Sequence, residues 1–278
     1  MRLFMRYPGG HAKALTFSYD DGVLSDIRFM NILAKYGMKA TFNINTGIFM
    51  SEDDAKRDKR PDRRMTEREC IDAYKNSPHE VAVHSVTHPC LECLPPCEAT
   101  AEILNDRTRL EELYSTFVRG GAYPYGTYSD TVVEILKNCG IEYFRTTVST
   151  HKMKLPDNWL TLHPTCHHND ERLGEITDNF LAATNERYPL LLYVWGHTYE
   201  FDRDDNWHVI EDFCEKFREV TNVWYCTNIE LFDYVKAYTS LVFSADCNCI
   251  YNPTQTDLWI SRDDIIYEIK AGETLNLR

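Results

Sequence analysis

Leu15-Thr-Phe-Ser-Tyr-Asp-Asp-Gly22 is the stretch that decides the fold of this chain. Its apolar, β-prone first half predicts a buried strand, and two adjacent carboxylates, Asp20 and Asp21, stand where that strand ends. Successive strand residues point to opposite faces, but Gly22 lets the backbone turn, so both carboxylates can reach one cavity. The same residues are also typical of a surface turn, and the histidines further along the chain decide between the two interpretations.

Strand-like and helical patterns alternate after this stretch, beginning with a helical spacing over residues 24–36 and a strand over 39–45. About seven such alternations predict an α/β fold, which either a barrel or a doubly wound sheet would satisfy. A charged stretch at 51–64 is expected to be a loop, and Thr66 with Glu69 predicts a capping box at the start of a helix. Beyond about Leu241 the pattern changes to short β runs. We therefore expect a barrel domain over 1–240 and a small β appendage over 241–278.

The bulk composition is that of an ordinary globular protein, with 278 residues, 43% of them hydrophobic and 26% charged. This length is enough to bury one large core. A formal net charge of −13 argues against nucleic acid or an anionic membrane as a partner, because either would repel this chain. A neutral or cationic small substrate is more compatible.

Ten cysteines in a chain of this length do not require a disulfide framework, so we expect mostly free thiols in a reducing compartment. The N-terminal residues lack the apolar core of about 7–15 residues that a secretory signal has. No later run approaches the roughly 20 apolar residues of a membrane span. The expected location is the cytoplasm.

Two histidines follow the next short buried strand, in His84-Ser-Val-Thr-His88-Pro89. On one turn of helix, residues four apart share a face, which suits two imidazoles that bind one metal ion. With Asp21 from another strand end they form a set of two histidines and one carboxylate with an open position. Such a set is typical of a catalytic site for Zn²⁺ or a similar divalent ion.

Four motifs occur in the order and spacing of one known family. They are Thr16-Phe-Ser-Tyr-Asp-Asp-Gly22, His84-Ser-Val-Thr-His-Pro89, Tyr123-Pro-Tyr-Gly126 and Leu191-Leu-Tyr-Val-Trp-Gly-His197. Together they make residues 13–240 resemble the NodB-homology polysaccharide deacetylases. The resemblance implies a distorted (β/α) barrel of about seven strands. It also implies one divalent ion, Zn²⁺ first and Co²⁺, Ni²⁺ or Mn²⁺ as alternatives, held by Asp21, His84 and His88.

The resemblance further implies the residues that carry out the reaction. Asp20 would be the general base, His197 the general acid, and Tyr125 would supply a backbone N–H to the oxyanion. The chemistry gives each a reason, because an amide is a poor electrophile and needs an activated water, a stabilised oxyanion and a protonated amine leaving group.

The chain departs from the family pattern at two places. Family members commonly carry an arginine two residues before the proline of the third motif, where it pairs with the base, and here that position is Ala122. Arg119 is the nearest arginine and is considered as its substitute. The aspartate that orients the acid histidine has no clear match, and Asp157 is a candidate.

Other residues near the motifs are candidates for further roles. Trp195, Tyr199, His167 and His168 are candidates for binding substrate, although aromatic residues and histidines beside strand ends are as often part of a core. Cys90, Cys93 and Cys97 resemble a metal knot, but their spacing is not that of two clean pairs, and we expect a loop with reduced thiols.

These observations predict a cytoplasmic, metal-dependent hydrolase that removes an N-acetyl group from an amino sugar or short glycan. One alternative keeps the chemistry and changes the substrate to a non-sugar amide, because Ala122 replaces the arginine. Another is a degenerate barrel that binds a carbohydrate without cleaving it. The intact acidic and histidine motifs argue against that last alternative.

Overall fold

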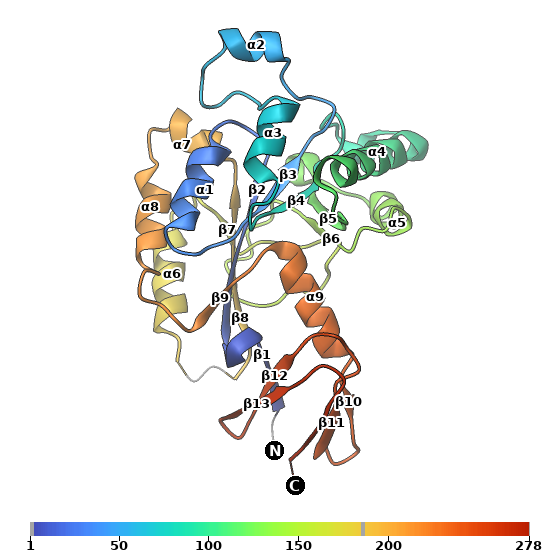
Figure 1. The fold of residues 1–278 in the computed structure, drawn as a ribbon, viewed down its shortest axis with the longest axis vertical. Coiled ribbons are helices and arrows are strands. Elements are labelled where there is room, and N and C mark those ends of the chain that lie inside the picture. Colours follow the sequence, from blue (N-terminus) through green and yellow to red (C-terminus); the bar gives the residue numbers. More distant parts are fainter. Residues whose placement is uncertain (1–2, 185–186, 278) are drawn as a thin grey trace.

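The computed structural model describes residues 3–184 and 187–277. Its main sheet, within that part of the chain, contains eight strands: β2 (Lys13–Asp20), β3 (Thr41–Ile44), β4 (Glu80–Val83), β5 (Gly120–Ala122), β6 (Tyr143–Arg145), β7 (Cys166–His167), β8 (Leu190–Gly196) and β9 (Val223–Tyr225). All pair in parallel, and seven follow one another in the order β6-β5-β4-β3-β2-β8-β7. The predicted distorted barrel is confirmed as a parallel half-barrel (Figure 1).

Strand β2 is the centre of this sheet, as the sequence predicts. Strand β8 runs along one side of it, while β9 pairs with residues 13–15 and β3 with residues 18–20 on the other side. All eight residues of β2 are buried. Burial on both faces explains why β8 reads as a continuous apolar run. In β2, Leu15, Phe17 and Tyr19 alternate with polar residues that are buried as well.

The helices lie around the half-barrel (Figure 1). They are α1 (Asp26–Ala34), α2 (Glu52–Arg57), α3 (Glu67–Tyr74), α4 (Pro96–Tyr114), α5 (Asp130–Asn138), α6 (Leu173–Ala182), α7 (Tyr199–Arg203), α8 (His208–Glu215) and α9 (Asn228–Thr239). Short 3₁₀ turns are η1 (Pro8–Gly10), η2 (Leu91–Cys93) and η3 (Pro124–Gly126). None of the described helices is both long and apolar enough to cross a bilayer.

Two local predictions for the helices have different outcomes. The capping box of Thr66 and Glu69 is present at the start of α3. The stretch 51–64 was expected to be a loop throughout, but it contains α2, whose N-cap Ser51 accepts a hydrogen bond from the Asp54 N–H. Acidic residues in the first turn and basic ones in the last complement the helix dipole, which supports this short helix without an apolar stripe.

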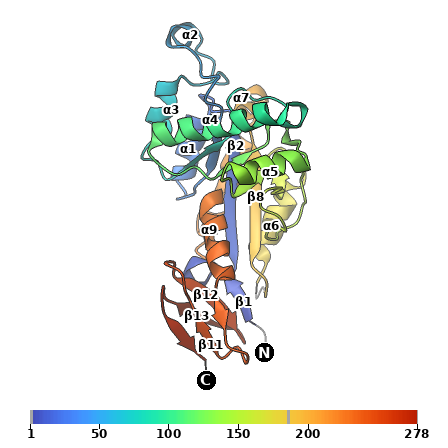
Figure 2. The same cartoon turned by 90° about the vertical axis from the view of Figure 1, so that its right-hand side faces the viewer.

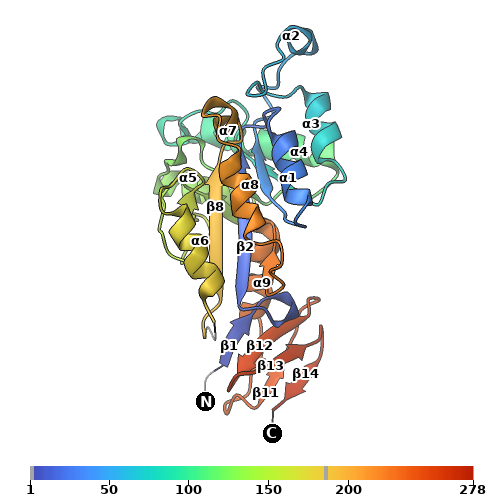
Figure 3. The same cartoon turned by 90° about the vertical axis from the view of Figure 1, so that its left-hand side faces the viewer.

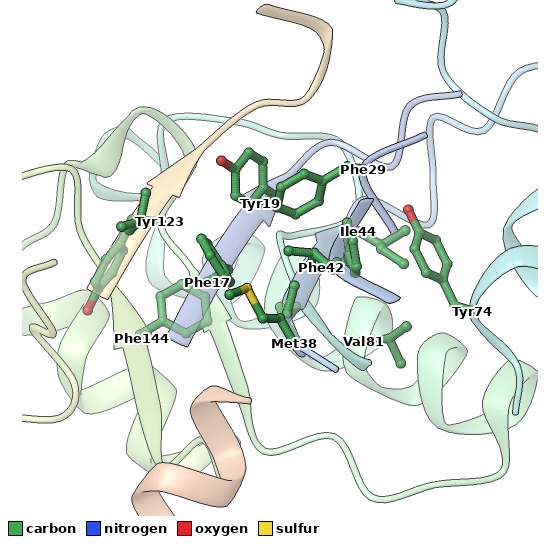
Figure 4. Packing of buried hydrophobic residues seen from close by; sticks show 14 of the residues in the cluster. Phe17, Tyr19, Phe29, Met38, Phe42, Ile44, Tyr74, Val81, Tyr123 and Phe144 are labelled. Atoms are coloured by element: carbon green, nitrogen blue, oxygen red, sulfur yellow. The ribbon is translucent and has the colours of Figure 1, made fainter. Parts of the chain in front are cut away.

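Aromatic side chains from β2, α1 and β3 fill the core between the sheet and its helices (Figure 4). The rings of Phe17 and Phe29 meet edge to face with centroids 5.9 Å apart, and Phe29 meets Phe42 in the same way at 6.2 Å. Tyr19 lies against Phe29 at 4.2 Å. This packing holds the C-terminal half of β2 rigidly, and therefore fixes the position of the carboxylates that follow it.

The predicted β appendage consists of two small antiparallel sheets. One contains β12 (Leu258–Arg262) and β13 (Ile265–Ile269), and the other contains β10 (Val242–Phe243), β11 (Cys249–Tyr251) and β14 (Thr274–Asn276). An addition comes from the N-terminus, because β1 (Leu3–Arg6) pairs with β12. The predicted limits at residues 1 and 278 lie outside the described residues.

The appendage lies at the opposite end of the molecule from α7 (Figures 2 and 3). Helix α7 directly follows the C-terminal end of β8. Because the carboxyl ends of parallel strands carry the functional loops in α/β proteins, the appendage is far from the end where the candidate site lies.

Candidate metal centre and active site

Asp20 is the last residue of β2, and its side chain is buried, with only 3% of the residue exposed. The Asn43 side-chain amide donates to its Oδ1 at 2.7 Å, and the Arg145 guanidinium donates to its Oδ2. Burial by itself would raise the pKa of Asp20, but the charge of Arg145, with contributions from His84 and His197, lowers this pKa to about 2. Asp20 is therefore an ionised carboxylate in a buried place.

Arg145 is the arginine that pairs with Asp20, which corrects the expectation for Arg119. Arg119 instead forms a bidentate pair with Asp233, at 2.9 and 2.6 Å, on the surface. Arg145 is the last residue of β6 and lies opposite Ala122 of β5 in the sheet. The arginine that the third motif lacks is thus supplied by the neighbouring strand, at the position paired with Ala122.

The burial and hydrogen bonds of Arg145 show that it belongs to the site. Its residue is fully buried, and besides Asp20 its guanidinium donates to the Ser18 hydroxyl at 3.1 Å and to the Thr146 carbonyl at 3.2 Å. The Trp195 ring covers it at 4.5 Å. A buried guanidinium is tolerated only when its donors are satisfied in this way.

Asp21 turns the chain away from the strand. Its φ is 88°, and Gly22 follows with φ 62°, so the reversal that the sequence predicted at Gly22 begins one residue earlier. Both carboxylates consequently face one histidine: Asp20 Oδ2 and Asp21 Oδ1 each lie 3.9 Å from His84 Nε2. Arg64 donates to Asp21 Oδ1 at 2.8 Å from the other side.

His84 directly follows β4 and is almost completely buried. Its Nδ1 lies 2.8 Å from the Ala122 carbonyl, so Nδ1 carries the proton and Nε2 carries the lone pair. Burial lowers the pKa of His84 to about 4, which keeps the ring neutral. Nε2 is buried and has no hydrogen-bond partner among the described residues. A neutral imidazole with an unused inward lone pair is the state that binds a metal ion.

His88 completes the set, but not by the helical spacing that the sequence suggested. Residues 84–88 form a loop in which Ser85 and His88 adopt φ values of 63° and 59°. The two imidazole rings nevertheless lie 4.7 Å apart, and His88 Nε2 is 4.0 Å from Asp21 Oδ1. The donor atoms of Asp21, His84 and His88 all lie within 4.8 Å of one another.

This donor set fits a divalent metal ion. Two imidazole nitrogens and one carboxylate are ligands that Zn²⁺ shares with Co²⁺, Ni²⁺ and Mn²⁺, and three protein ligands leave room for a water or substrate. The buried, unpartnered Nε2 of His84 is the observation that supports the fit, because such an atom is costly unless something binds it.

Backbone strain gathers around the same place. Asp21, Ser85, His88 and Tyr125 all have φ between 59° and 88°, although none is glycine. Each such residue costs on the order of 1–3 kcal/mol, and such strain clusters at functional sites. Tyr125 belongs to η3, and its ring lies edge-on to His88 at 4.7 Å. The third motif is therefore brought next to the metal ligands.

His197 follows β8, and its Nε2 lies 3.8 Å from Asp20 Oδ2, the same oxygen that lies 3.9 Å from His84 Nε2. Its Nδ1 lies 3.4 Å from Glu200 Oε2. Burial lowers the pKa of His197, but Glu200 and Asp20 outweigh it and raise this pKa above its ordinary value. Asp20 is thus the shared neighbour of two histidines.

Glu200, in α7, is the carboxylate on His197, which corrects the expectation for Asp157. Asp157 is an exposed residue that pairs with Lys154 at 2.6 Å. Glu200 instead lies 3.0 Å from His167 Nε2 and also accepts from the His197 backbone N–H at 3.2 Å. Although Glu200 is partly desolvated, its contacts with His167 and His197 lower its pKa, so it is ionised.

The four candidate substrate-binding residues differ in exposure and in the side chains they contact. His167 and Tyr199 are partly exposed, and the Tyr199 ring lies 5.1 Å from His197. Trp195 is only 8% exposed and covers Arg145. His168 is 1% exposed and stacks between Tyr19 and Phe201, so it is packed in the core and offers little surface to a substrate.

Sequence reasoning missed Arg145 and Glu200, although each left a signal. Arg145 is a charged residue at the end of an otherwise apolar strand, and Glu200 stands three residues after His197, within reach across one helical turn. Neither signal identifies the residue that is contacted. The contact of Arg145 depends on strand register, and that of Glu200 depends on the turn after β8.

Comparison with known proteins gives a family match. The model of the family "Polysaccharide deacetylase" matches residues 7–144. A protein from Mycobacterium smegmatis named for the same family shares 16% identity over 84% of this chain and 93% of its own, with a TM-score of 0.56. That likeness shows a common fold. No curated protein matches this chain.

Two further structures are similar at lower TM-scores. The Streptococcus pyogenes deacetylase PplD, in complex with acetate, shares 24% identity with a TM-score of 0.44, over 52% of this chain and 61% of its own. The wild-type pseudoenzyme BA3943 from Bacillus anthracis shares 18% identity with a TM-score of 0.47, over 83% of this chain and 68% of its own.

Proposed function

This chain belongs to the polysaccharide deacetylase family, and from that premise we propose that it is a metal-dependent hydrolase that removes an N-acetyl group from an amino sugar or short glycan. One observation carries the proposal. The unpartnered Nε2 of His84 lies 3.9 Å from both carboxylates, and His197 Nε2 lies 3.8 Å from Asp20. A carbohydrate-binding module has no use for an open metal site beside an ionised, buried carboxylate.

Asp21, His84 and His88 would hold the ion, which we propose to be Zn²⁺, with Co²⁺, Ni²⁺ or Mn²⁺ as alternatives. When bound, such an ion polarises the amide carbonyl and lowers the pKa of a coordinated water towards neutrality. Arg64, which donates to Asp21 at 2.8 Å, would hold that carboxylate in the orientation its ligand role needs.

Asp20 would accept the proton of the attacking water. Its low pKa of about 2 keeps it ionised throughout the neutral range, so it is always able to accept. Asn43 and Arg145 each occupy one of its oxygens and fix the orientation of the carboxylate. A base held in this way needs no reorganisation when the proton moves.

His197 would protonate the amine that leaves. A general acid is most effective when its pKa lies near the working pH, and Glu200 with Asp20 raises the pKa of His197 in that direction. The Nδ1 side faces Glu200, which leaves Nε2 directed at the reacting groups. The backbone N–H of Tyr125 is proposed as a donor to the oxyanion, since its ring borders His88.

The proposed substrate is a small N-acetylated sugar or oligosaccharide, and the proposed location remains the cytoplasm. The partly exposed Tyr199 and His167 beside His197 support a sugar-sized group at this position. The alternative of a non-sugar amide rested on Ala122 in place of arginine. Arg145 supplies the missing contact to Asp20, so that reason for the alternative weakens.

The decisive test is Asp20→Asn. We expect acetate release from N-acetylglucosamine oligomers to fall by roughly 10²–10⁴-fold, because the base is lost, while the metal content stays the same. Acetate is measured enzymatically and metal by mass spectrometry on the same samples. Asp257→Asn, which changes a partly exposed carboxylate paired with Lys270 in the appendage, is the matched control.

The outcomes separate the hypotheses. Full activity in the Asp20→Asn variant would remove this residue from its role. A wild-type protein that binds metal but releases acetate from no sugar, while hydrolysing simple amides, would favour the non-sugar substrate. Metal without any hydrolysis would favour a binding module.

A further inference from the structure

A pair of thiols stands on the segment that follows His88. Cys90 and Cys93 flank the short turn η2, and their sulfurs lie 2.8 Å apart. Both are free cysteines, Cys90 partly exposed and Cys93 exposed. A turn with two cysteines three residues apart, side by side and open to solvent, is what an intramolecular disulfide needs, because little movement is required to close it.

The other described cysteines differ from this pair in burial or in position. Cys70, Cys139, Cys166, Cys214 and Cys226 are buried. Cys97, Cys247 and Cys249 are at least partly exposed, but within the described part of the chain none of their sulfurs lies within hydrogen-bond distance of another cysteine sulfur. Exposure favours oxidation of a thiol, and a neighbouring thiol allows an intramolecular disulfide to form, and Cys90 with Cys93 combines both.

A third thiol does not join the pair to form a metal knot. Within the described residues, the sets of three donors close enough to share one ion are made of histidine and carboxylate side chains, and none includes a cysteine. Two thiolates alone do not complete a structural zinc site, which takes four ligands. The expected loop is found around Cys90 and Cys93, at the turn η2, but Cys97 lies in α4. That the thiols are reduced stays a prediction, and the pairing adds a chemical property to it.

We propose that Cys90 and Cys93 form a reversible dithiol–disulfide site, with a small disulfide such as oxidised glutathione as the oxidant. The thiolate of one cysteine attacks a sulfur of the oxidant, which forms a mixed disulfide and releases one glutathione thiolate. The second cysteine then attacks the mixed disulfide, so the Cys90–Cys93 bond forms and the second glutathione leaves. Two cysteine protons go to the two released thiolates, and two electrons pass to the oxidant.

The position of the pair gives the modification a structural consequence. Cys90 is two residues after His88, and its sulfur lies 4.0 Å from the Thr127 hydroxyl, directly after η3. A bond across η2 would therefore stiffen the segment between a proposed metal ligand and the start of α4. The inference does not depend on the proposed function, because the thiol chemistry can be measured without substrate.

The test is differential alkylation of the full-length protein. The reduced protein is incubated with oxidised glutathione, free thiols are blocked with one maleimide, and thiols recovered by dithiothreitol are labelled with a second isotopic form. We expect Cys90 and Cys93 to be protected together, in a peptide that has lost two hydrogens and carries no glutathione. Reduction should restore both thiols completely.

Matched variants decide whether the pair is specific. Cys97→Ser and Cys247→Ser, which change other exposed cysteines, should leave the protection unchanged. Cys93→Ser should convert Cys90 to a stable mixed disulfide with glutathione, since the resolving thiol is absent. The proposal is overturned if Cys90 and Cys93 stay fully open to the first maleimide while Cys97 or Cys247 is oxidised. It is equally overturned if the wild type accumulates glutathione on Cys90 or Cys93 without closing the bond.

Discussion

Two clusters of histidine and carboxylate lie side by side in this molecule and share one geometry. In Asp21 with His84 and His88, and in Glu200 with His167 and His197, the three donor atoms fall within 4.8 Å of one another. Judged by distance alone, both are metal sites. The two clusters differ in the hydrogen bond that Nδ1 of one histidine makes: His84 in the first cluster and His167 in the second.

In the first cluster, His84 Nδ1 donates to the Ala122 carbonyl at 2.8 Å, which leaves a lone pair on the inward Nε2. In the second, the Asn169 N–H donates to His167 Nδ1 at 3.1 Å, so the proton must sit on the inward Nε2, which donates to Glu200 at 3.0 Å. A nitrogen that carries its proton cannot bind a metal ion. The first cluster is prepared for an ion, whereas in the second His167 Nε2 carries a proton and Glu200 lies 3.4 Å from His197 Nδ1.

The largest expected effect is a difference in Zn²⁺ affinity between matched variants of the two clusters. His84→Ala should weaken binding of Zn²⁺ by more than about 100-fold, because loss of an outer-shell partner alone typically costs 10–100-fold. His167→Ala, the matched change in the second cluster, should alter the affinity by no more than about twofold. Both are measured by competition with a chelator of known affinity.

Equal losses of Zn²⁺ affinity in His84→Ala and His167→Ala would show that a proton on His167 Nε2 does not distinguish the two clusters. Because His84 is buried and its removal leaves a cavity, His84→Gln serves as a second variant that keeps volume, and thermal unfolding of all variants checks that each is folded. Retention of metal in folded His84→Gln and His84→Ala would exclude this residue as a ligand.

A second expected effect concerns the residue between the clusters. Asp20 lies 3.9 Å from His84 and 3.8 Å from His197, and Arg145 keeps it anionic. In Arg145→Met the burial of Asp20 is no longer offset by that charge, so its pKa rises from about 2. Turnover needs the ionised form, so the acid limb of the pH–rate profile should move to higher pH. Arg145 also orients the carboxylate, so the two effects together should lower activity at neutral pH by roughly 10–100-fold.

Arg119→Met is the matched control for this prediction, because Arg119 pairs with Asp233 and should leave the profile unchanged. The sharper experiment restores the charge from the neighbouring strand. Residues 122 and 145 are paired in register, so Ala122→Arg combined with Arg145→Met should recover part of the activity and return the acid limb towards its original place. A double variant no better than Arg145→Met would show that the guanidinium must come from β6.

Stability should follow the same charge pair. A depressed folded-state pKa means that Asp20 stabilises the fold above the ordinary pKa of an aspartate, about 4, and that this contribution is lost as the pH falls towards 2. Removing one partner of a buried ion pair costs roughly 3–5 kcal/mol, since the other charge is left unpaired. Urea unfolding at pH 7 should therefore show a lower free energy of unfolding for Arg145→Met than for Arg119→Met.

The sequence was sufficient for the groups that motifs and strand ends specify. Asp20, Asp21, His84 and His197 each follow directly from, or end, a buried strand, and parallel strands bring such ends together. The parallel α/β fold followed from the alternation of patterns, and the resemblance to the deacetylase family implied the barrel. These features are local, so one sequence shows them.

The remainder depends on pairing between distant segments. Arg145 reaches Asp20 only because β5 and β6 share a register, and β1 joins β12 across almost the whole chain. His84 and His88 meet through two left-handed residues and not through a helical turn. Neither strand register nor positive φ at non-glycine residues is encoded in a short pattern, which explains why these features were missed or assigned another geometry.

The smallest expected effect tests the second cluster as a support for His197. Glu200→Gln keeps the shape but removes the charge that raises the pKa of His197, and the amide is a poorer partner for His197 Nδ1. We expect kcat to fall by roughly tenfold, with no change in metal content, because an oriented acid contributes more than a misoriented one. Asp157→Asn, an exposed carboxylate paired with Lys154, is the matched control and should have no effect.

The pH–rate profile distinguishes support of the acid from a merely structural contact. His197 acts in its protonated form, so activity is lost as the pH rises through its pKa, and a lower pKa in Glu200→Gln must move that alkaline limb to lower pH. Arg145→Met moves the opposite limb in the opposite direction, so the two variants together narrow the active range from both sides. A uniform loss of rate in Glu200→Gln, with the alkaline limb in place, would mean that Glu200 only holds α7, and that the two clusters differ in metal binding but not in proton transfer.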